Sequence, residues 1–198
     1  AWTFAAPTFI DGPYLDVNTS TTTLNPGATT GTGVTLAASA DLFASTDVGR
    51  LVSLPGGNAT ITAFTDAQNV TITINETLSA ATATTNWALG AWSDTTGYPS
   101  SVTFFEQRLV FAATTNEPQT LFFSKNGDYQ NMTAGTNDND ALIYQIASNQ
   151  VNNIRYMSAT RVLTIGTSGG EYVLTTTNDG PVTPVSYTHL TLPTNCVV

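Results

Sequence analysis

The sequence predicts an all-β protein, and three observations support this fold class. Charged residues make up only 10% of the 198 residues, against roughly 25% in ordinary soluble domains. Thr, Ser, Asn and Gly take their place, and these residues suit strands and turns better than surface helices. Apolar residues also alternate with Thr over Val70–Ile74, which is the period of a strand with one buried face.

The first 92 residues predict an extended segment followed by a small β module. Prolines and Gly/Thr stretches punctuate residues 1–33, so we expect an extended N-terminal segment and a loop there. Residues 34–92 predict a small antiparallel β-barrel or sheet. Its clearest hairpin joins strands at 50–54 and 59–64 through a Pro-Gly-Gly-Asn turn, and residues 66–69 form the next turn.

Residues 93–184 continue as strands that are richer in aromatic residues. The expected strands are 102–105, 108–113, 120–124, 141–146, 153–156, 161–166 and 171–175. An internal repeat is visible here, because Arg108–Thr114 resembles Arg161–Thr167, which starts 53 residues later. A period of roughly 40–50 residues with four strands per repeat is typical of β-propeller blades, which need neighbours to cover their faces. The pattern favours partial β-propeller blades, and a chance likeness between two hairpins is the alternative.

Charge and composition exclude several function classes. Fourteen acidic residues against five basic ones give a net charge of -9, so no basic stripe can form to neutralise phosphates, and we expect no specific DNA binding. One Cys and one His exclude a disulfide framework and a Cys/His zinc site within one chain. No apolar run reaches about 18 residues, so the sequence predicts no membrane helix and no membrane partner.

Several ordered motifs resemble one known family. Residues 97–111 read GYPSSVTFFEQRLVF, residues 118–129 read PQTLFFSKNGDY, and 140–143 and 148–154 read DALI and SNQVNNI. IGT at 165–167 and GEY at 170–172 follow. These segments resemble the tail nozzle, or tail tubular protein B-like, proteins of short-tailed bacteriophages and the related stabilisation proteins. The likeness covers residues 1–184 and is densest from Trp92 to Leu174.

The resemblance implies a structural protein of the virion tail and not an enzyme. Such proteins are β-propellers with inserted β domains, form homo-oligomeric rings that are commonly hexamers, and lie beside the tail adaptor. They assemble in the host bacterial cytoplasm, and DNA passes through the ring during ejection without specific binding. The resemblance carries over no catalytic, cofactor-binding or metal-binding residue and implies no cofactor. The alternatives are a tail-associated glycan-binding module and a glycan-degrading enzyme.

Acidic residues provide the candidates for chemistry. Asp138 and Asp140, with the neighbouring Asn137 and Asn139, resemble half of a calcium loop, but the Gly and bidentate Glu of an EF-hand are missing. We favour a solvated turn, with a structural ion as the alternative. A glycosidase would need two carboxyls about 5–9.5 Å apart. The candidates are Glu106, Glu117, Asp128 and Glu171, for which we favour a surface role.

Other candidates have structural interpretations that we favour. The Gly-rich segment Gly166–Gly170 lies between two expected strands, which indicates a hairpin turn and not a phosphate cradle. Arg108 and Arg161 are expected to begin corresponding strands and to form salt bridges at blade edges. Eight aromatic residues could form a sugar platform, but at strand spacing they more often pack sheets; they are Trp87, Trp92, Tyr98, Phe104, Phe105, Phe111, Phe122 and Phe123.

The last residues need a separate interpretation. Residues 185–194 read VSYTHLTLPT and resemble translated sequencing-adapter read-through in metagenome-derived reading frames. We therefore expect residues 185–198 to be a disordered artefactual tail, which removes His189 and Cys196 from functional interpretation. A Ser-His-Asp triad would need His189, and no Gly-x-Ser-x-Gly elbow is present. Because the chain begins at Ala1 and not at Met, we expect a metagenomic fragment of a longer protein.

Overall fold

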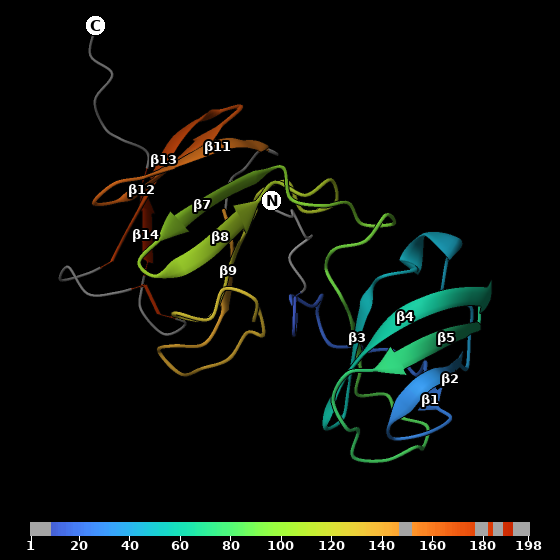
Figure 1. The fold of residues 1–198 in the computed structure, drawn as a ribbon. Coiled ribbons are helices and arrows are strands. Elements are labelled where there is room, and N and C mark those ends of the chain that lie inside the picture. Colours follow the sequence, from blue (N-terminus) through green and yellow to red (C-terminus); the bar gives the residue numbers. More distant parts are fainter. Residues whose placement is uncertain (1–8, 147–151, 177–181, 184–187, 192–198) are drawn as a thin grey trace, which may run out of the picture. The chain divides into compact units, whose positions relative to one another are not determined.

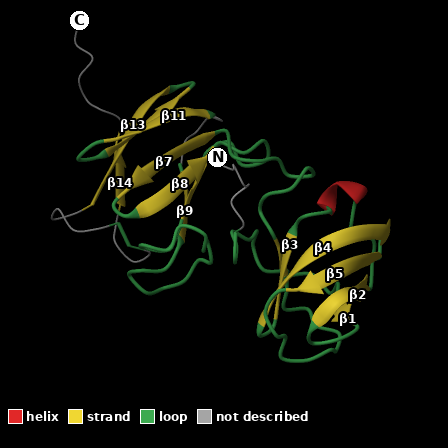
Figure 2. Ribbon diagram, in the orientation of Figure 1, coloured by secondary structure: helices red, strands yellow, loops and turns green. Residues whose placement is uncertain are grey.

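The protein is all-β and divides into two compact units, Gly12–Gly97 and a second unit made of 1–11 with 98–198 (Figures 1 and 2). The computed structural model describes residues 9–146, 152–176, 182–183 and 188–191. Within those residues the helical element is a single 3-10 turn, η1 (Ser45–Asp47). No helix in that part of the chain is long and apolar enough to cross a membrane.

The unit 12–97 is built on one six-stranded sheet. Its strands are β1 (Leu24–Pro26), β2 (Gly31–Ala38), β3 (Leu51–Leu54), β4 (Gly57–Asp66), β5 (Asn69–Ile74) and β6 (Ala88–Leu89). They pair in the order β1-β2-β5-β4-β3-β6, with long, curled β4 and β5 beside each other in Figure 1. The predicted antiparallel module is therefore confirmed, and the alternating residues of β5 place Val70 and Ile72 in the core.

Both predicted hairpins of this sheet form. Leu54 pairs with Gly57 across the Pro55-Gly56 turn, and Gly56 has a φ of 91°, which a Pro-Gly turn of type II requires. Asp66 pairs with Asn69 at the next turn, where its carboxylate accepts hydrogen bonds from the Gln68 N–H and the Asn69 side-chain amide. These two contacts lower the pKa of Asp66, the Asn69 bond contributing more.

The unit begins earlier than the sequence predicts. Residues 1–33 were expected to be an extended segment, but β1 and β2 lie partly inside that range and belong to the sheet. Tyr14 also bridges Gly90, and the Leu24 and Thr84 backbones exchange hydrogen bonds. These pairings join residues more than 50 positions apart, so no local sequence pattern reveals them.

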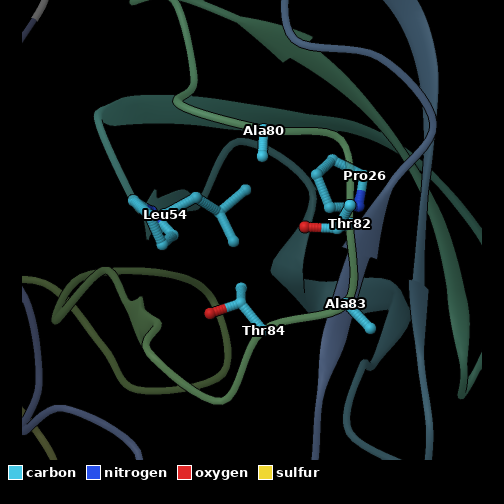
Figure 3. A pocket seen from close by; sticks show the side chains of 7 residues that line it. Pro26, Leu54, Ala80, Thr82, Ala83 and Thr84 are labelled. Carbon is cyan, nitrogen blue, oxygen red and sulfur yellow. The ribbon is translucent and has the colours of Figure 1, made fainter.

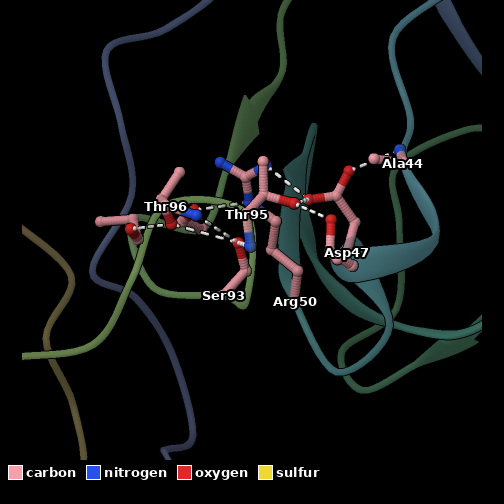
Figure 4. Close-up of polar contacts among 9 residues, drawn as sticks. Ala44, Asp47, Arg50, Ser93, Thr95 and Thr96 are labelled. Carbon is pink, nitrogen blue, oxygen red and sulfur yellow. Dashed lines mark hydrogen bonds and ion pairs between the residues drawn. The ribbon is translucent and has the colours of Figure 1, made fainter. Parts of the chain in front are cut away.

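A buried ion pair stabilises the last residues of this unit (Figure 4). Arg50 and Asp47 are both buried, and the Arg50 Nη1 lies 2.9 Å from the Asp47 Oδ1. The Arg50 Nε donates to the Gly90 carbonyl at 2.8 Å, and the Thr95 hydroxyl donates to the Asp47 Oδ1 at 2.7 Å. The other Asp47 oxygen accepts the Ala44 N–H. The pair thus connects η1 to the segment that leaves the sheet after β6.

The second unit contains two four-stranded antiparallel meanders. The first consists of β7 (Ser101–Phe105), β8 (Arg108–Ala112), β9 (Thr120–Phe123) and β10 (Leu142–Gln145). The second consists of β11 (Ile154–Ala159), β12 (Leu163–Thr167), β13 (Gly170–Thr176) and β14 (Thr188–Thr191). Every strand expected between residues 102 and 175 is present, with bounds shifted by a few residues at most.

The 53-residue repeat corresponds to equivalent core positions in these two sheets. Three pairs of buried residues differ by this offset: Val110 and Leu163, Ala112 and Ile165, and Leu121 and Leu174. All six belong to one core cluster, so the sheets turn equivalent faces toward each other. The two sheets therefore share one core. The arrangement as propeller blades stays a prediction.

The expectation of disorder for residues 185–198 fails at four positions. The backbone of β14 pairs with β13, with Leu190 opposite Leu174 and Thr188 opposite Thr176. A polar and apolar alternation in THLT is sufficient for a short edge strand. Cys196 lies outside the described residues.

The Asp47–Arg50 pair gives a stability prediction. Replacing Arg50 with Met should lower the free energy of unfolding by about 3–5 kcal/mol, because it leaves the Asp47 carboxylate buried without its counter-charge. Urea unfolding of the full chain measures this. Thr65→Ala, at an exposed position of β4, is the control and should change the value by less than about 0.5 kcal/mol. An equal effect of the two substitutions would contradict the structural role of the pair.

Candidate functional site

Three of the sequence motifs, residues 97–111, 118–129 and 140–143, meet at the loop that joins β9 to β10. The β7–β8 hairpin lies beside this loop and turns at Glu106 and Gln107, whose φ values of 47° and 59° define a type I′ turn. The carbonyl of Gln107 accepts the Gly127 N–H at 2.9 Å. The motifs at 97–111 and 118–129 are therefore joined by a backbone hydrogen bond.

Arg108 is the centre of this region. Its side chain is buried, with 1% of the residue exposed. Nη1 donates to the carbonyls of Ser124 at 2.7 Å and Asp140 at 2.6 Å, and Nη2 donates to the carbonyl of Asp138 at 2.6 Å. Burial lowers the pKa of Arg108, and the nearby Glu106 opposes this shift. The guanidinium remains charged under all ordinary conditions.

The role expected of Arg108 is wrong, and the structure places Arg161 differently from Arg108. Arg108 begins β8 as predicted, but it binds backbone carbonyls, whereas a blade-edge salt bridge was expected. Arg161 precedes β12 and is exposed in the turn between Ala159 and Leu163, so it does not occupy the corresponding position. The second hairpin has a three-residue turn, residues 160–162, where the first has two, so β12 begins at Leu163 and Arg161 lies in the turn.

The proposed calcium half-loop is organised by protein groups. The Asp140 carboxylate accepts the backbone N–H of Asn137 at 3.0 Å and its side-chain amide at 2.9 Å. Lys125 lies 3.7 Å from the other Asp140 oxygen. The Arg108 guanidinium binds the carbonyls of residues 138 and 140, which are oxygens that a cation in this loop would use. This arrangement favours the solvated turn.

The four candidate carboxylates have different surroundings. Glu106 accepts the Val182 N–H at 2.7 Å, and Glu171 accepts the Tyr156 hydroxyl, which raises the pKa of Tyr156. The Glu117 backbone N–H is bonded to the Thr114 hydroxyl, and Asp128 is exposed in the loop after β9. Within the described residues no group of three or more His, Cys, Asp or Glu side chains is arranged to hold a metal ion.

A small groove in the unit 12–97 is a poor candidate for chemistry (Figure 3). Its volume is about 160 Å³. The lining is made of apolar and Thr side chains with no ionisable group: Pro26, Leu54, Pro55, Ala80, Thr82, Ala83 and Thr84. The groove therefore offers neither an acid nor a base.

The Gly-rich segment forms a hairpin turn, as predicted. Thr167 pairs with Gly170 across Ser168 and Gly169, and the Thr167 hydroxyl donates to the Gly170 carbonyl at 2.7 Å. Gly166 lies within β12 under the Tyr156 ring, where a Cβ would meet the ring carbons at 2.0 Å. A side chain at this position would displace Tyr156 from its contact with Glu171.

The aromatic residues divide into a buried group and an exposed group. Trp87, Phe105, Phe122 and Phe123 are buried, and Trp92 and Phe111 are half-buried. Two of the eight candidates, Tyr98 and Phe104, are exposed. The Phe104 ring makes an edge contact with Tyr129, with 5.2 Å between the ring centroids. Sheet packing therefore accounts for most of the set, as the sequence interpretation favoured.

We define the outer face as the apolar side of the β7–β10 sheet that points away from its core. One residue from each strand forms a row across it: Val102, Phe111, Phe122 and Ile143. Phe104 belongs to the next row. Phe9 packs on Phe111 with 5.8 Å between ring centroids, while 57% of Val102 and 60% of Phe104 remain exposed. This face was not identified from the sequence, although the alternation in VTFF at 102–105 is consistent with it.

Comparisons with known proteins do not identify the chain. No protein-family model matches the sequence, and no curated protein matches it either.

Replacing Arg108 should destabilise the second unit. Arg108→Met leaves one buried and two part-buried carbonyls without their donor, which should cost about 3 kcal/mol. Arg108→Lys should cost less than Arg108→Met but should still destabilise the unit. Its ammonium keeps the charge but cannot reproduce the planar fork of the guanidinium. Urea unfolding and amide exchange at Asn126 and Asp140 measure the effect. Arg155→Met, at an exposed position of β11, is the matched control; a similar loss there would argue against a specific role of Arg108.

The Asp140 turn should depend on pH. Hydrogen bonds from the Asn137 backbone, and then from its side chain, with the nearby Lys125 lower the pKa of Asp140. A carboxyl whose pKa is lowered by folding adds stability above its unfolded pKa of about 3.9, and that stability is lost as the pH falls through the lower folded pKa. Titration of the Asp140 side-chain carbonyl carbon by NMR should show the lower midpoint. Asn137→Ala should move the midpoint back up, and no movement would contradict this cause.

Proposed function

We propose that this chain is a structural subunit of a bacteriophage tail nozzle or hub, and that it forms part of the wall of the DNA-ejection channel. The observation that carries the proposal is how the family-like motif residues are used. Arg108 and Ser124 are buried and bind backbone groups, and Gly127 has a φ of 71° in a tight turn. Motif residues with architectural roles are what a structural subunit requires.

The surface chemistry supports the same proposal. A protein that lets DNA pass must not bind phosphates, and phosphate binding depends on Lys and Arg. Of the five basic residues, Arg50 and Arg108 are buried on protein acceptors, and Lys125 lies beside Asp140. The net charge of -9 therefore favours a wall that repels DNA.

The ring and the propeller arrangement are proposed from the strand order of the second unit and from the family resemblance. A four-stranded antiparallel meander is the unit of a propeller blade, and both sheets of the second unit have this strand order. We propose a homo-oligomeric ring, commonly a hexamer in the family that the sequence resembles, beside the tail adaptor in the virion. Within one chain the two sheets share one core, so a ring would be built through their other faces.

A glycan-binding module is the second candidate function, and one observation favours it. Phe104, Tyr129 and Tyr98 are exposed, and exposed aromatic rings can stack on sugars. A glycan-degrading enzyme would need in addition two carboxyls across a cleft. The structure places Glu106 and Glu171 on separate partners, which does not favour that role.

The proposal is tested by assembly and ligand binding of the full chain. Native mass spectrometry should show ring-sized oligomers at high protein concentration, and a mobility shift at low salt should show no DNA retention. A glycan array with hydrolysis assays examines the second candidate. If the chain is a structural subunit, neither the unaltered chain nor Phe104→Ser should bind or cleave a glycan. A monomer at all concentrations that binds or cleaves a glycan, with binding lost in Phe104→Ser, would overturn the structural proposal.

A further inference from the structure

The turn at Asn126 and Gly127 brings an exposed side-chain amide next to a glycine nitrogen. The Asp128 N–H donates to the Lys125 carbonyl at 3.3 Å, so Asn126 and Gly127 are the two central residues of a β-turn. Gly127 has a φ of 71°, and a positive φ at the third position of a turn favours glycine. The turn therefore accounts for the glycine. It gives no role to the Asn126 side chain, which is exposed and makes no hydrogen bond within the described part of the chain.

This pair of residues can react with itself. Asparagine is a thermolabile residue, and glycine has no side chain to keep its backbone nitrogen away from a neighbouring group. Among the asparagines of the sequence, Asn126 alone precedes a glycine. We propose that Asn126 is a self-modification site, which is converted to aspartate or isoaspartate, and that the contacts of the β9–β10 loop restrain this conversion. The inference does not depend on the tail function.

The reaction needs water as its only other reactant. The Gly127 backbone nitrogen gives its proton to the solvent, and its electron pair forms a bond to the side-chain carbonyl carbon of Asn126. The bond from that carbon to the amide nitrogen breaks, and the nitrogen takes up protons and leaves as ammonia. Water then opens the cyclic imide. Attack at the side-chain carbon gives aspartate, whereas attack at the backbone carbonyl carbon gives isoaspartate, and nothing is oxidised or reduced.

The folded turn holds the proton that this reaction must remove. The Gly127 N–H donates to the Gln107 carbonyl at 2.9 Å, and the Asn126 N–H donates to the Asn139 carbonyl at 3.0 Å. The Gly127 nitrogen becomes a nucleophile only when the first of these bonds opens. Amide hydrogen exchange has the same requirement, so both processes should follow the population of the open turn.

Arg108 sets how easily the turn opens. Its guanidinium binds the carbonyl of Ser124, which lies two residues before Asn126. It also binds the carbonyls on both sides of Asn139, those of residues 138 and 140. Opening of the turn therefore disturbs the same contacts that anchor the loop, and loss of Arg108 should speed the conversion.

Conversion would in turn loosen the loop. Isoaspartate adds one atom to the main chain at residue 126, which disrupts the spacing of the hydrogen bonds to residues 107 and 139. Aspartate adds a carboxylate to a chain whose net charge is already -9. The site thus acts as a slow, irreversible switch from an anchored to a released loop.

The experiment measures conversion at residue 126 in the full 198-residue chain. Samples are incubated in mildly alkaline buffer, and mass spectrometry of their peptides, with chromatographic separation of the two products, gives the rate. Conversion in the native chain should be at least about tenfold slower than in the urea-unfolded chain, the factor that about 1.4 kcal/mol of opening free energy corresponds to. Arg108→Met should raise the native rate, whereas Arg155→Met should leave it unchanged. Asn126→Gln should abolish the signal.

Three results would overturn the proposal. Absence of conversion at residue 126 in the unfolded chain would exclude the site. Equal rates in the native and the unfolded chain would exclude the restraint. The third is a native rate that stays constant while urea, added below the unfolding transition, accelerates amide exchange at Gly127. This urea series needs no substitution, so it decides the matter even if Arg108→Met fails to fold.

Discussion

A buried guanidinium that binds backbone carbonyls organises the β9–β10 loop of this protein. Arg108 gives its donors to the carbonyls of Ser124, Asp138 and Asp140, which lie at the two ends of the long β9–β10 loop. Buried carbonyls need donors, and this loop has few regular strand partners of its own. The guanidinium therefore does for the loop what a bound cation would do, and the charge is built into β8.

Other contacts of the region are consistent with this anchor. The Ser124 hydroxyl accepts the Leu109 N–H next to Arg108, and Gly127 bonds to the Gln107 carbonyl. Tyr129 then makes its ring contact with Phe104 on β7. The first residues of β8 thus fix both the path of the β9–β10 loop and one side of the outer face. This is the arrangement that supports a structural role for the motif residues.

Local patterns in the sequence predicted the strands but not their long-range partners. The alternation at Val70–Ile74 and the Pro55-Gly56 turn depend only on neighbouring residues, so both were predictable. The 53-residue repeat placed Val110 and Leu163 in equivalent core positions. It misplaced Arg161, because that residue lies in the turn 160–162, which stands where the first hairpin already has strand. The acceptors of Arg108, 16 to 32 residues away, leave no periodic signal.

The central claim is tested most directly by the side-chain NMR signals of Arg108. If its guanidinium is held by three carbonyls, its Nη protons should be resolved, should exchange slowly with water and should show hindered rotation about the Nε–Cζ bond. Arg155, exposed on β11, supplies the reference in the same spectrum, with averaged and rapidly exchanging signals. Arg108 signals that average and exchange as fast as those of Arg155 would contradict the account.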